Sequence, residues 1–388
     1  MVDPALEGKL FQNEKKIQSF HGLFNSKSPI GCDIGRTLLW RFLYWVDLLE
    51  DSNRTLLTKS LFRLLLFLLF VMNLDNLRRA VTTFSFRIDD SFFRASILHF
   101  SCYVISAIVW YALRQKRKTL ASLLKILRKK YTLTLTKTQI LALLFIYSTP
   151  IITVILFFTS HNRRNEWYIN GIKTNYTIYV VVNCIRIIFD IFTYPMFINL
   201  VAFLYCFICQ SICDLVTQFT SEIQACPFEE LTVRRQTDIF RKMSGIEHAL
   251  NLTQKVFSVP SFLISVAHFC SSIAVLAVIT YLKEDIKFNR QIEWILVFMN
   301  SSCGLLAILW NAGSLPIEAE KLKIAYRRKC RQKLLSENKV GELRSENDLI
   351  DTSNFVLSGC NIIHFYRSSL LALAGTILTY TVLLISKN

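Results

Sequence analysis

Long apolar runs separated by charged segments dominate the chain. Six runs are free or nearly free of charge and reach about the 20 residues that a helix needs to cross a bilayer. A seventh, at 57–74, contains Lys59 and Arg63, whose long side chains can snorkel to a headgroup layer. The pattern predicts an all-α, polytopic membrane protein with seven transmembrane helices. The predicted spans are 57–74, 95–113, 139–160, 177–208, 259–282, 292–313 and 360–385.

Composition supports this class. Of 388 residues, 52% are hydrophobic and only 19% are charged, whereas soluble domains carry about 25% charged residues. No Gly-rich phosphate loop, metalloprotease motif, serine-nucleophile elbow or spaced Cys/His set occurs in the sequence. We therefore expect neither an enzyme nor a resident metal or cofactor.

The lysines and arginines predict the orientation. Segment 114–130 has eight basic residues and no acid, and segment 321–333 has seven basic residues and no acid. By the positive-inside rule both face the cytosol, which places the amino terminus inside and the carboxy terminus outside a plasma membrane. The net charge of +17 is then explained by topology and by the anionic lipid bilayer, so that no nucleic-acid partner is expected.

These spans divide the chain into six parts. The predicted divisions are a cytosolic segment at 1–56, helices one to four at 57–208 with a basic cytosolic loop at 114–138, a cytosolic helical extension at 209–258, helices five and six at 259–313, a cytosolic helical segment at 314–359 and helix seven at 360–388.

Four Asn-x-Ser/Thr sequons test the topology. Asn53 and Asn251 fall in the cytosol and Asn300 falls inside a helix in this arrangement. Only Asn175, in the sequence TNYT, is predicted to face outside, so it is the one candidate for glycosylation.

The last 29 residues, CNIIHFYRSSLLALAGTILTYTVLLISKN, resemble the seventh helix of insect gustatory receptors. That family has a polar start, a Leu-Leu pair, a Gly, a Thr-Tyr pair, a short apolar stretch and a terminal Gln-Phe. Leu370, Leu371, Gly375, Thr379 and Tyr380 stand in this register. The helix count, the predicted orientation and the length also agree.

The resemblance implies a tetrameric, ligand-gated cation channel whose seventh helix lines the pore. It also implies cytosolic segments that join the subunits near the symmetry axis, although from the sequence alone these segments could equally dock another protein. The chain departs from the pattern at Thr381, where an apolar residue is commoner, and at Ser386 and Lys387, which replace Gln-Phe. That departure puts the chemistry at the outer end of the pore in question.

Hydroxyl groups on the last helix suggest how ions would pass. Ser368, Thr376 and Thr379 fall close to one face of a helix. Such a stripe can coat a pore without fixed charge, or the hydroxyls can bond to their own backbone four residues earlier. Gly375 would allow close helix packing. The predicted pore residues are Thr376, Thr379, Tyr380, Leu383 and Ser386.

Polar residues inside the other spans predict a ligand pocket. Arg186 and Asp190 lie four apart and can pair, and charges at this depth are costly and usually functional. Residue counts place polar side chains of four other spans at similar depth, where they could converge on a pocket open to the outside. The resemblance implies such a pocket in the outer half of each subunit. A structural pair and interfacial packing are the alternatives. The predicted pocket residues are Tyr103, Tyr147, Arg186, Asp190, His268 and Asn300.

The leading hypothesis is a gustatory-type receptor in which a small-molecule tastant or similar ligand opens a pore for monovalent and divalent cations, as a homo- or heterotetramer. One alternative is a divergent receptor-like protein without channel activity. A G-protein-coupled receptor would show an Arg flanked by an acid and Tyr after helix three, and a transporter two repeated halves. Neither pattern occurs in the sequence.

Overall fold

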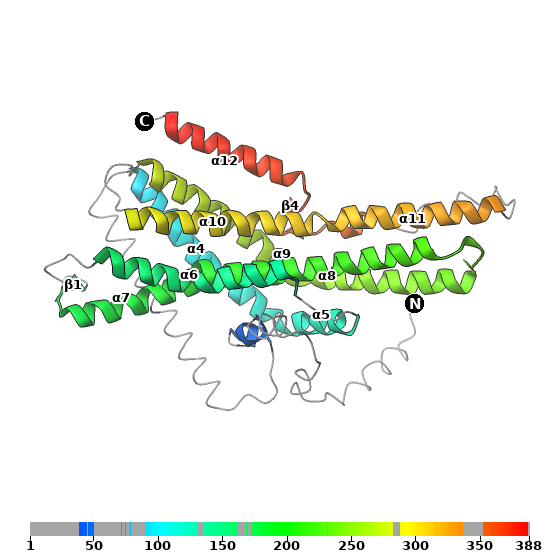
Figure 1. Ribbon diagram of the computed structural model, residues 1–388, viewed down its shortest axis with the longest axis horizontal. Helices are drawn as coiled ribbons and strands as arrows, with labels where there is room; N and C mark the ends of the chain where they lie inside the picture. Colours follow the sequence, from blue (N-terminus) through cyan, green and yellow to red (C-terminus); the bar gives the residue numbers. More distant parts are fainter. Residues whose placement is uncertain are drawn as a thin grey trace, which may run out of the picture.

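The computed structural model describes residues 39–44, 46–49, 71, 74, 78, 90–130, 135–161, 168–169, 172–230, 232–281, 288–336 and 352–386. Helices account for most of them (Figure 1). The elements are α4 (Asp90–Gln115), α5 (Arg117–Lys130), α6 (Lys137–His161), β1 (Tyr168–Ile169), β2 (Ile172–Lys173), α7 (Tyr176–Ile191), the π turn η3 (Phe192–Met196), α8 (Phe197–Ala225), the 3₁₀ turn η4 (Phe228–Glu230), α9 (Val233–Tyr281), α10 (Phe288–Ala312), α11 (Leu315–Ser336), the 3₁₀ turn η6 (Thr352–Phe355), β3 (Ser358–Gly359), β4 (Ile363–His364) and α12 (Ser369–Ser386).

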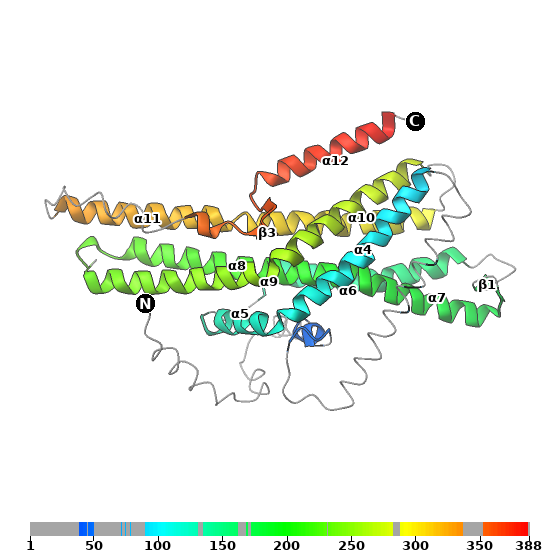
Figure 2. The ribbon, with the colours of Figure 1, turned by 180° about the vertical axis from the view of Figure 1, so that it is seen from behind.

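The helices define two ends of an elongated molecule. At the bundled end, α8, the first half of α9 and α11 run side by side (Figures 1 and 2). At the fanned end, α4, α6, α7, α10 and the second half of α9 diverge. The antiparallel β1–β2 hairpin lies at the tip of the fanned end, and the carboxy terminus of α12 points toward the same end. Which end faces the cytosol stays a prediction.

The all-α class is confirmed: apart from the two-residue strands β1 to β4, the regular structure of the described residues is helical. In these ranges, four stretches are long and apolar enough to cross a membrane: Lys137–Leu156, Tyr176–Ala225, Arg234–Ile279 and Gln291–Lys333. Helices α4 and α12 occupy the predicted second and seventh spans. The first predicted span lies almost wholly outside the described residues, so the count of seven stays a prediction.

Helix α9 extends well beyond the thickness of a membrane. Its 49 residues rise about 73 Å at 1.5 Å per residue, against about 30 Å for the hydrocarbon core. The predicted fifth span and residues 233–258 before it are one continuous helix, whereas the start of the predicted cytosolic extension belongs to α8. Through its length α9 contacts both the fanned helices and the bundled helices, so it connects the two ends of the molecule.

A proline interrupts the helical stretch from α7 to α8. Pro195 cannot donate a backbone hydrogen bond and disfavours the helical conformation of the residue before it. Tyr194 accordingly has φ −152° and ψ 128° within the π turn η3. The extended backbone at this one position directs the tyrosine ring into the core, where it is 1% exposed. The predicted fourth span is therefore two helices, α7 and α8, joined by the π turn η3.

The predicted seventh helix begins too early. Residues 358–364 form the antiparallel β3–β4 hairpin, and α12 starts at Ser369 rather than at residue 360. Cys360 and Asn361 form the hairpin turn with positive φ values of 53° and 57°, which a helix cannot contain. Ile363 of this segment packs against the core, whereas Ile362 is exposed at the hairpin.

The β3–β4 hairpin is clamped to α9. The side-chain amide of Gln254 donates to the backbone oxygen of Ser358 at 2.9 Å and to its hydroxyl at 2.7 Å, and Gln254 Oε1 accepts from the backbone N–H of Ser358 at 3.0 Å. A Cβ at Gly359 would lie 2.9 Å from the Phe262 Cβ, so only glycine allows this approach. The chain leading into α12 is thus fixed to the longest helix of the protein.

The basic segment after α4 is itself a structured helix. The leucines of α5 at positions 120, 123, 124 and 127 are buried, and the helix packs against α9. Nearby, the buried carboxylate of Asp47 forms ion pairs with Arg114 at 3.2 Å and with Arg117 at 3.5 Å. The apolar face of α5 is therefore occupied by protein, and its charges lie on the other side.

Candidate functional site

A buried polar layer crosses the centre of the fanned helices. We use this name for Thr149, Tyr194, Asn199, His268, Ser271, Asn300 and Ser301, all of which are less than 9% exposed. They come from α6, η3, α8, α9 and α10. Because polar groups inside an apolar helix bundle must find partners from neighbouring helices, such a layer fixes how the helices pack.

One chain of hydrogen bonds in this layer links three helices. Asn300 Nδ2 on α10 donates to Thr149 Oγ1 on α6 at 3.1 Å, and Asn300 Oδ1 accepts from Asn199 Nδ2 on α8 at 3.2 Å. A second set joins the next residue of α10 to η3 and α9. The hydroxyls of Tyr194 and Ser301 are 3.2 Å apart, and Ser301 donates to Ser271 at 3.0 Å. Consecutive residues of α10 therefore hold four other elements.

Tyrosine rings close one side of the layer. Tyr103 on α4 is buried and meets the Tyr194 ring edge-on, with ring centroids 6.1 Å apart. The Tyr194 hydroxyl also donates to the backbone oxygen of Ala267 on α9 at 3.4 Å. The contact between the two rings places Tyr103 beside the layer. The structure therefore brings together three of the predicted pocket residues: Tyr103, His268 and Asn300.

His268 differs from the rest of the layer. Its side chain is fully buried, and neither ring nitrogen has a hydrogen-bond partner among the described residues. The ring lies against Gly304 of α10, where a Cβ would be 2.6 Å from His268 Nε2 and 3.1 Å from Asn199 Oδ1. A neutral imidazole offers one donor and one acceptor, and leaving such groups buried without partners costs about 1–3 kcal/mol. A ligand that pairs with them regains that energy.

The other predicted pocket residues lie around the layer. Tyr147 on α6 is half-buried and packs against the core. Arg186 and Asp190 are half-buried, one turn apart, on α7. Helix α7 packs against α6 and η3, the elements that carry Thr149 and Tyr194 of the layer. Their part in ligand binding stays a prediction.

Sequence reasoning missed five members of the layer: Thr149, Tyr194, Asn199, Ser271 and Ser301. The hydroxyl groups gave no signal because most serines and threonines in apolar helices bond to their own backbone, as Thr153 does to the Thr149 oxygen. Asn199 did offer a signal, since an amide in an apolar span requires a partner.

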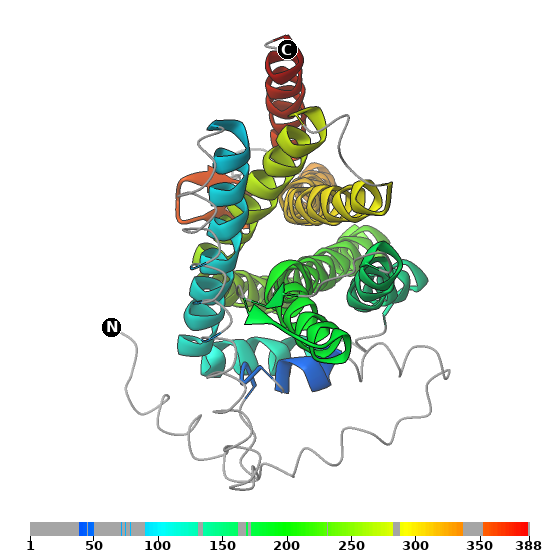
Figure 3. The same ribbon diagram turned by 90° about the vertical axis from the view of Figure 1, so that its left-hand side faces the viewer.

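Helix α12, with the predicted pore residues, projects from the other helices (Figure 3) and contacts α9 and α10, with Leu370 and Leu373 packed against the core. Thr376, Thr379, Tyr380 and Leu383 are exposed in the single chain, and the side chain of Ser386 lies outside the described ones. Thr376 and Thr379 donate to the backbone oxygens four residues earlier at 2.8 Å. That these residues line a pore stays a prediction.

Gly375 does not bring helices together in the single chain. A Cβ at Gly375 would meet nothing within 4 Å in the described structure, which corrects the expectation that it packs closely on a neighbouring helix. Leu371 is 80% exposed and Leu383 is 55% exposed on the same helix. An apolar helix with uncovered sides is covered by lipid or by other chains.

Asn175, the predicted glycosylation site, is the exposed N-cap of α7. Its side-chain oxygen accepts from the backbone N–H of Thr177 at 3.4 Å. It follows directly on the β1–β2 hairpin at the fanned end. Asn300, by contrast, is buried in the polar layer and so is inaccessible to a glycosylating enzyme.

The described fold resembles that of solved insect olfactory receptors. The insect olfactory receptor OR5 from Machilis hrabei in complex with eugenol matches with a TM-score of 0.68 and 15% sequence identity, covering 92% of this chain and 99% of that chain. A second structure of OR5 from Machilis hrabei gives a TM-score of 0.66 and 18% identity, with 91% and 98% covered. No protein-family model and no curated protein matches the sequence. At these identities the likeness shows a shared fold.

Proposed function

We propose that the protein is a chemosensory receptor that acts as a ligand-gated, nonselective cation channel in the plasma membrane. The observation that supports it most is the shared fold with an insect olfactory receptor over almost the whole of both chains. A receptor channel of this fold is favoured over an enzyme, a G-protein-coupled receptor or a transporter. The Thr379-Tyr380 register favours the gustatory type.

The geometry supports an assembly of four chains around α12. This helix projects from the single chain with exposed apolar sides, so neighbouring copies would cover part of it and surround a central pore. Thr376 and Thr379 would present uncharged oxygens there, because each hydroxyl proton is already bonded to the backbone. Uncharged oxygens suit a pore that passes monovalent and divalent cations alike.

The ligand would bind beside the buried polar layer, in the part of each chain that carries the predicted pocket. His268 supplies the donor and acceptor that the described residues leave unpaired, and Tyr103 and Tyr194 supply aromatic walls. The members of this layer are uncharged, so the layer suits a small neutral molecule with a hydroxyl or carbonyl group. Arg186 and Asp190 remain candidates at its rim.

The channel itself is tested by recording currents from cells that express the protein alone. Phenols, bitter compounds, sugars and lipophilic odorants form the ligand panel. We expect a ligand-evoked cation current whose permeability ratios change in Tyr380→Ala, because that side chain would line the pore. Tyr111→Ala is the matched control, since Tyr111 is an exposed tyrosine on α4. Equal changes in both variants would contradict the assignment of the pore.

The ligand site is tested by dose-response curves of the same current. We expect His268→Leu to raise the ligand concentration for half-maximal response about tenfold, since one hydrogen bond is worth about 1–1.5 kcal/mol. His248→Leu is the control, because His248 is an exposed histidine outside the layer on α9. If Asp190 lies at the rim of the site, Asp190→Ala should shift the dose-response curve. If Asp190 is structural, the same variant should instead reduce surface expression. An unchanged dose-response in His268→Leu would exclude His268 from the site.

A second candidate function is a receptor-like protein that binds its ligand without conducting. Ser386 and Lys387 stand where the resembled family has Gln-Phe, and this departure specifically favours it. Protein that reaches the surface and binds ligand, with no evoked current at all, would establish this function instead.

A further inference from the structure

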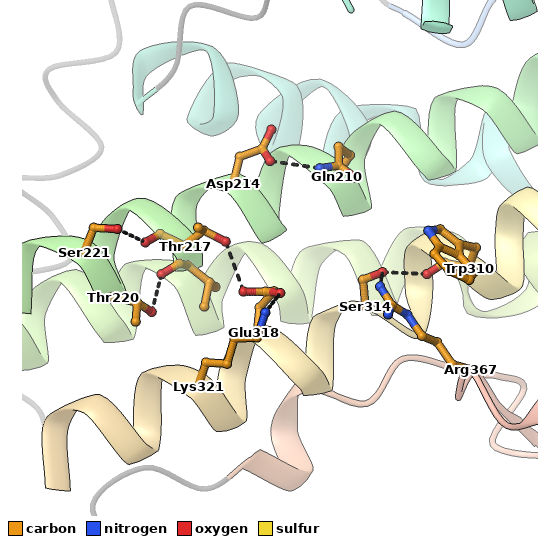
Figure 4. A network of polar contacts seen from close by, with 11 residues as sticks. Gln210, Asp214, Thr217, Thr220, Ser221, Trp310, Ser314, Glu318, Lys321 and Arg367 are labelled. Carbon is orange, nitrogen blue, oxygen red and sulfur yellow. Dashed lines mark hydrogen bonds and ion pairs between the residues drawn. The ribbon is translucent and has the colours of Figure 1, made fainter. Parts of the chain in front are cut away.

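An open groove lies where α10, α11 and the start of α12 meet. Its volume is about 480 Å³, and its lining includes Gly313, Ile317, Lys321, Ile324, Tyr366 and Arg367. None of the lining residues belongs to the buried polar layer. The proposed gating mechanism does not use this groove. Figure 4 shows polar contacts of two of its lining residues, Lys321 and Arg367.

Arg367 is held in place at one end of this groove. Its guanidinium carbon lies 4.3 Å from the centre of the Trp310 ring, and Nη2 donates to Ser314 Oγ at 2.9 Å (Figure 4). Its Nε is buried and has no hydrogen-bond partner, and in the described ranges the guanidinium forms no ion pair with a carboxylate. A fixed guanidinium with unused donors is suited to bind phosphate in a bidentate manner.

The surrounding charge is positive. Lys321 lies in the groove and also pairs with Glu318 at 2.7 Å, and Glu320 adds one acidic side chain to the lining. Against these two glutamates, α11 carries seven lysines and arginines. Charge complementarity therefore favours an anion in the groove.

The groove also has the position and the apolar surface that a lipid needs. The chain passes from the apolar helix α10 to the basic helix α11 within two residues, as it would at a membrane surface. Trp310 is 55% exposed and Tyr366 is 44% exposed at this level, where interfacial aromatics are expected. Ile317 and Ile324 provide an exposed apolar wall that a soluble anion would not use.

We propose that this groove binds an anionic phospholipid. Arg367 and Lys321 hold the headgroup phosphate, and an acyl chain lies along Ile317 and Ile324. The lipid would occupy the junction between the helix that crosses the membrane and the pore helix. The inference rests on α10 crossing the bilayer, and it is independent of which ligand the receptor senses.

Native mass spectrometry of the full-length protein in detergent tests the proposal. The probes are phosphatidylserine and phosphatidylcholine with identical acyl chains, and soluble phosphoserine. We expect phosphatidylserine to bind at least tenfold more tightly than either of the other two probes. Equal binding of both lipids would overturn the proposal. Tight binding of phosphoserine would overturn the lipid as the occupant.

Variants place the binding in the groove. Arg367→Gln and Lys321→Gln are each expected to weaken phosphatidylserine binding about tenfold, the loss of one charge-assisted hydrogen bond. Arg241→Gln is the control, because Arg241 is an exposed arginine on α9 that pairs with Asp238. Lys321 is exposed, so Lys321→Gln should leave the fold intact. It therefore tests the proposal even where Arg367→Gln unfolds the chain. Unchanged binding in Lys321→Gln would show that the groove holds no lipid.

Discussion

Replacing Gly304 by leucine is expected to stop the protein from reaching the cell surface in folded form. The reason is the contact between α10 and α9. A Cβ at this position would lie 2.6 Å from His268 Nε2 and 2.9 Å from Cε1, far inside contact distance. His268 is fully buried and cannot move away without displacing its neighbours. The smaller change Gly304→Ala should lower the free energy of unfolding by about 1–3 kcal/mol, as overpacking does.

Gly375→Ala provides a control of opposite sign. Gly375 is also a glycine inside a helix, here α12, but nothing in the described structure lies within 4 Å of its Cβ position. Alanine is favoured over glycine in a helix by about 1 kcal/mol, so this variant should be slightly more stable. The measurement is thermal unfolding of each purified variant in detergent. Equal behaviour of the two alanine variants would contradict the close approach of α9 and α10.

A double-mutant cycle assigns the effect to His268. In a His268→Ala background the obstacle is gone, so Gly304→Ala should no longer destabilise the protein. The expected interaction energy is about 1–3 kcal/mol. Additive effects of the two changes would mean that another neighbour opposes the added carbon.

Much of the fold could be predicted because apolar runs determine membrane helices. The predicted span 139–160 falls within α6 and the predicted span 292–313 coincides with α10 to within a few residues. Length and hydropathy are local properties of the sequence, so a single chain reveals them.

The candidate site was less predictable because it depends on which helices meet. Residue counts placed Tyr103, His268 and Asn300 at similar depth, and the structure shows all three at or beside the polar layer. Tyr194 was missed because its direction depends on the irregular backbone before Pro195. A count along an ideal helix cannot anticipate that change of direction.

The predicted start of the last helix, residue 360, was wrong for a similar reason. Ile363 and Phe365 are apolar, and by composition they extend the last span. The positive φ values at Cys360 and Asn361 instead turn the chain into a hairpin. Hydropathy records that these residues avoid water, but it does not distinguish burial in protein from burial in lipid.

Phe365→Ala is expected to cost about 3–5 kcal/mol of folding free energy, because it removes a large, fully buried ring. Phe365 follows β4 directly and precedes α12 by three residues, so it anchors the start of the predicted pore helix. Its ring lies 6.3 Å from that of Tyr205 on α8, and Tyr205 in turn lies 5.3 Å from Phe257 on α9. No polar contact can replace this packing.

The matched control is Phe145→Ala. Phe145 lies on α6 with 38% of its surface exposed, and surface substitutions usually change stability by less than about 0.5 kcal/mol. Thermal unfolding in detergent compares the two variants. A Phe365→Ala protein as stable as the control would contradict the role of this ring as the anchor of α12.

The same variant separates stability from gating under the proposed function. Gln254 would still hold the β3–β4 hairpin on α9 through its three hydrogen bonds to Ser358, so the hairpin should stay attached when Phe365 is removed. The segment that leads into the predicted pore helix would then be held on α9 by hydrogen bonds, but its packing on Tyr205 of α8 would be lost. Surface-expressed Phe365→Ala should therefore bind ligand and show less than a tenth of the evoked current. A current that survives unchanged would mean that movement reaches α12 through the Gln254 contact alone.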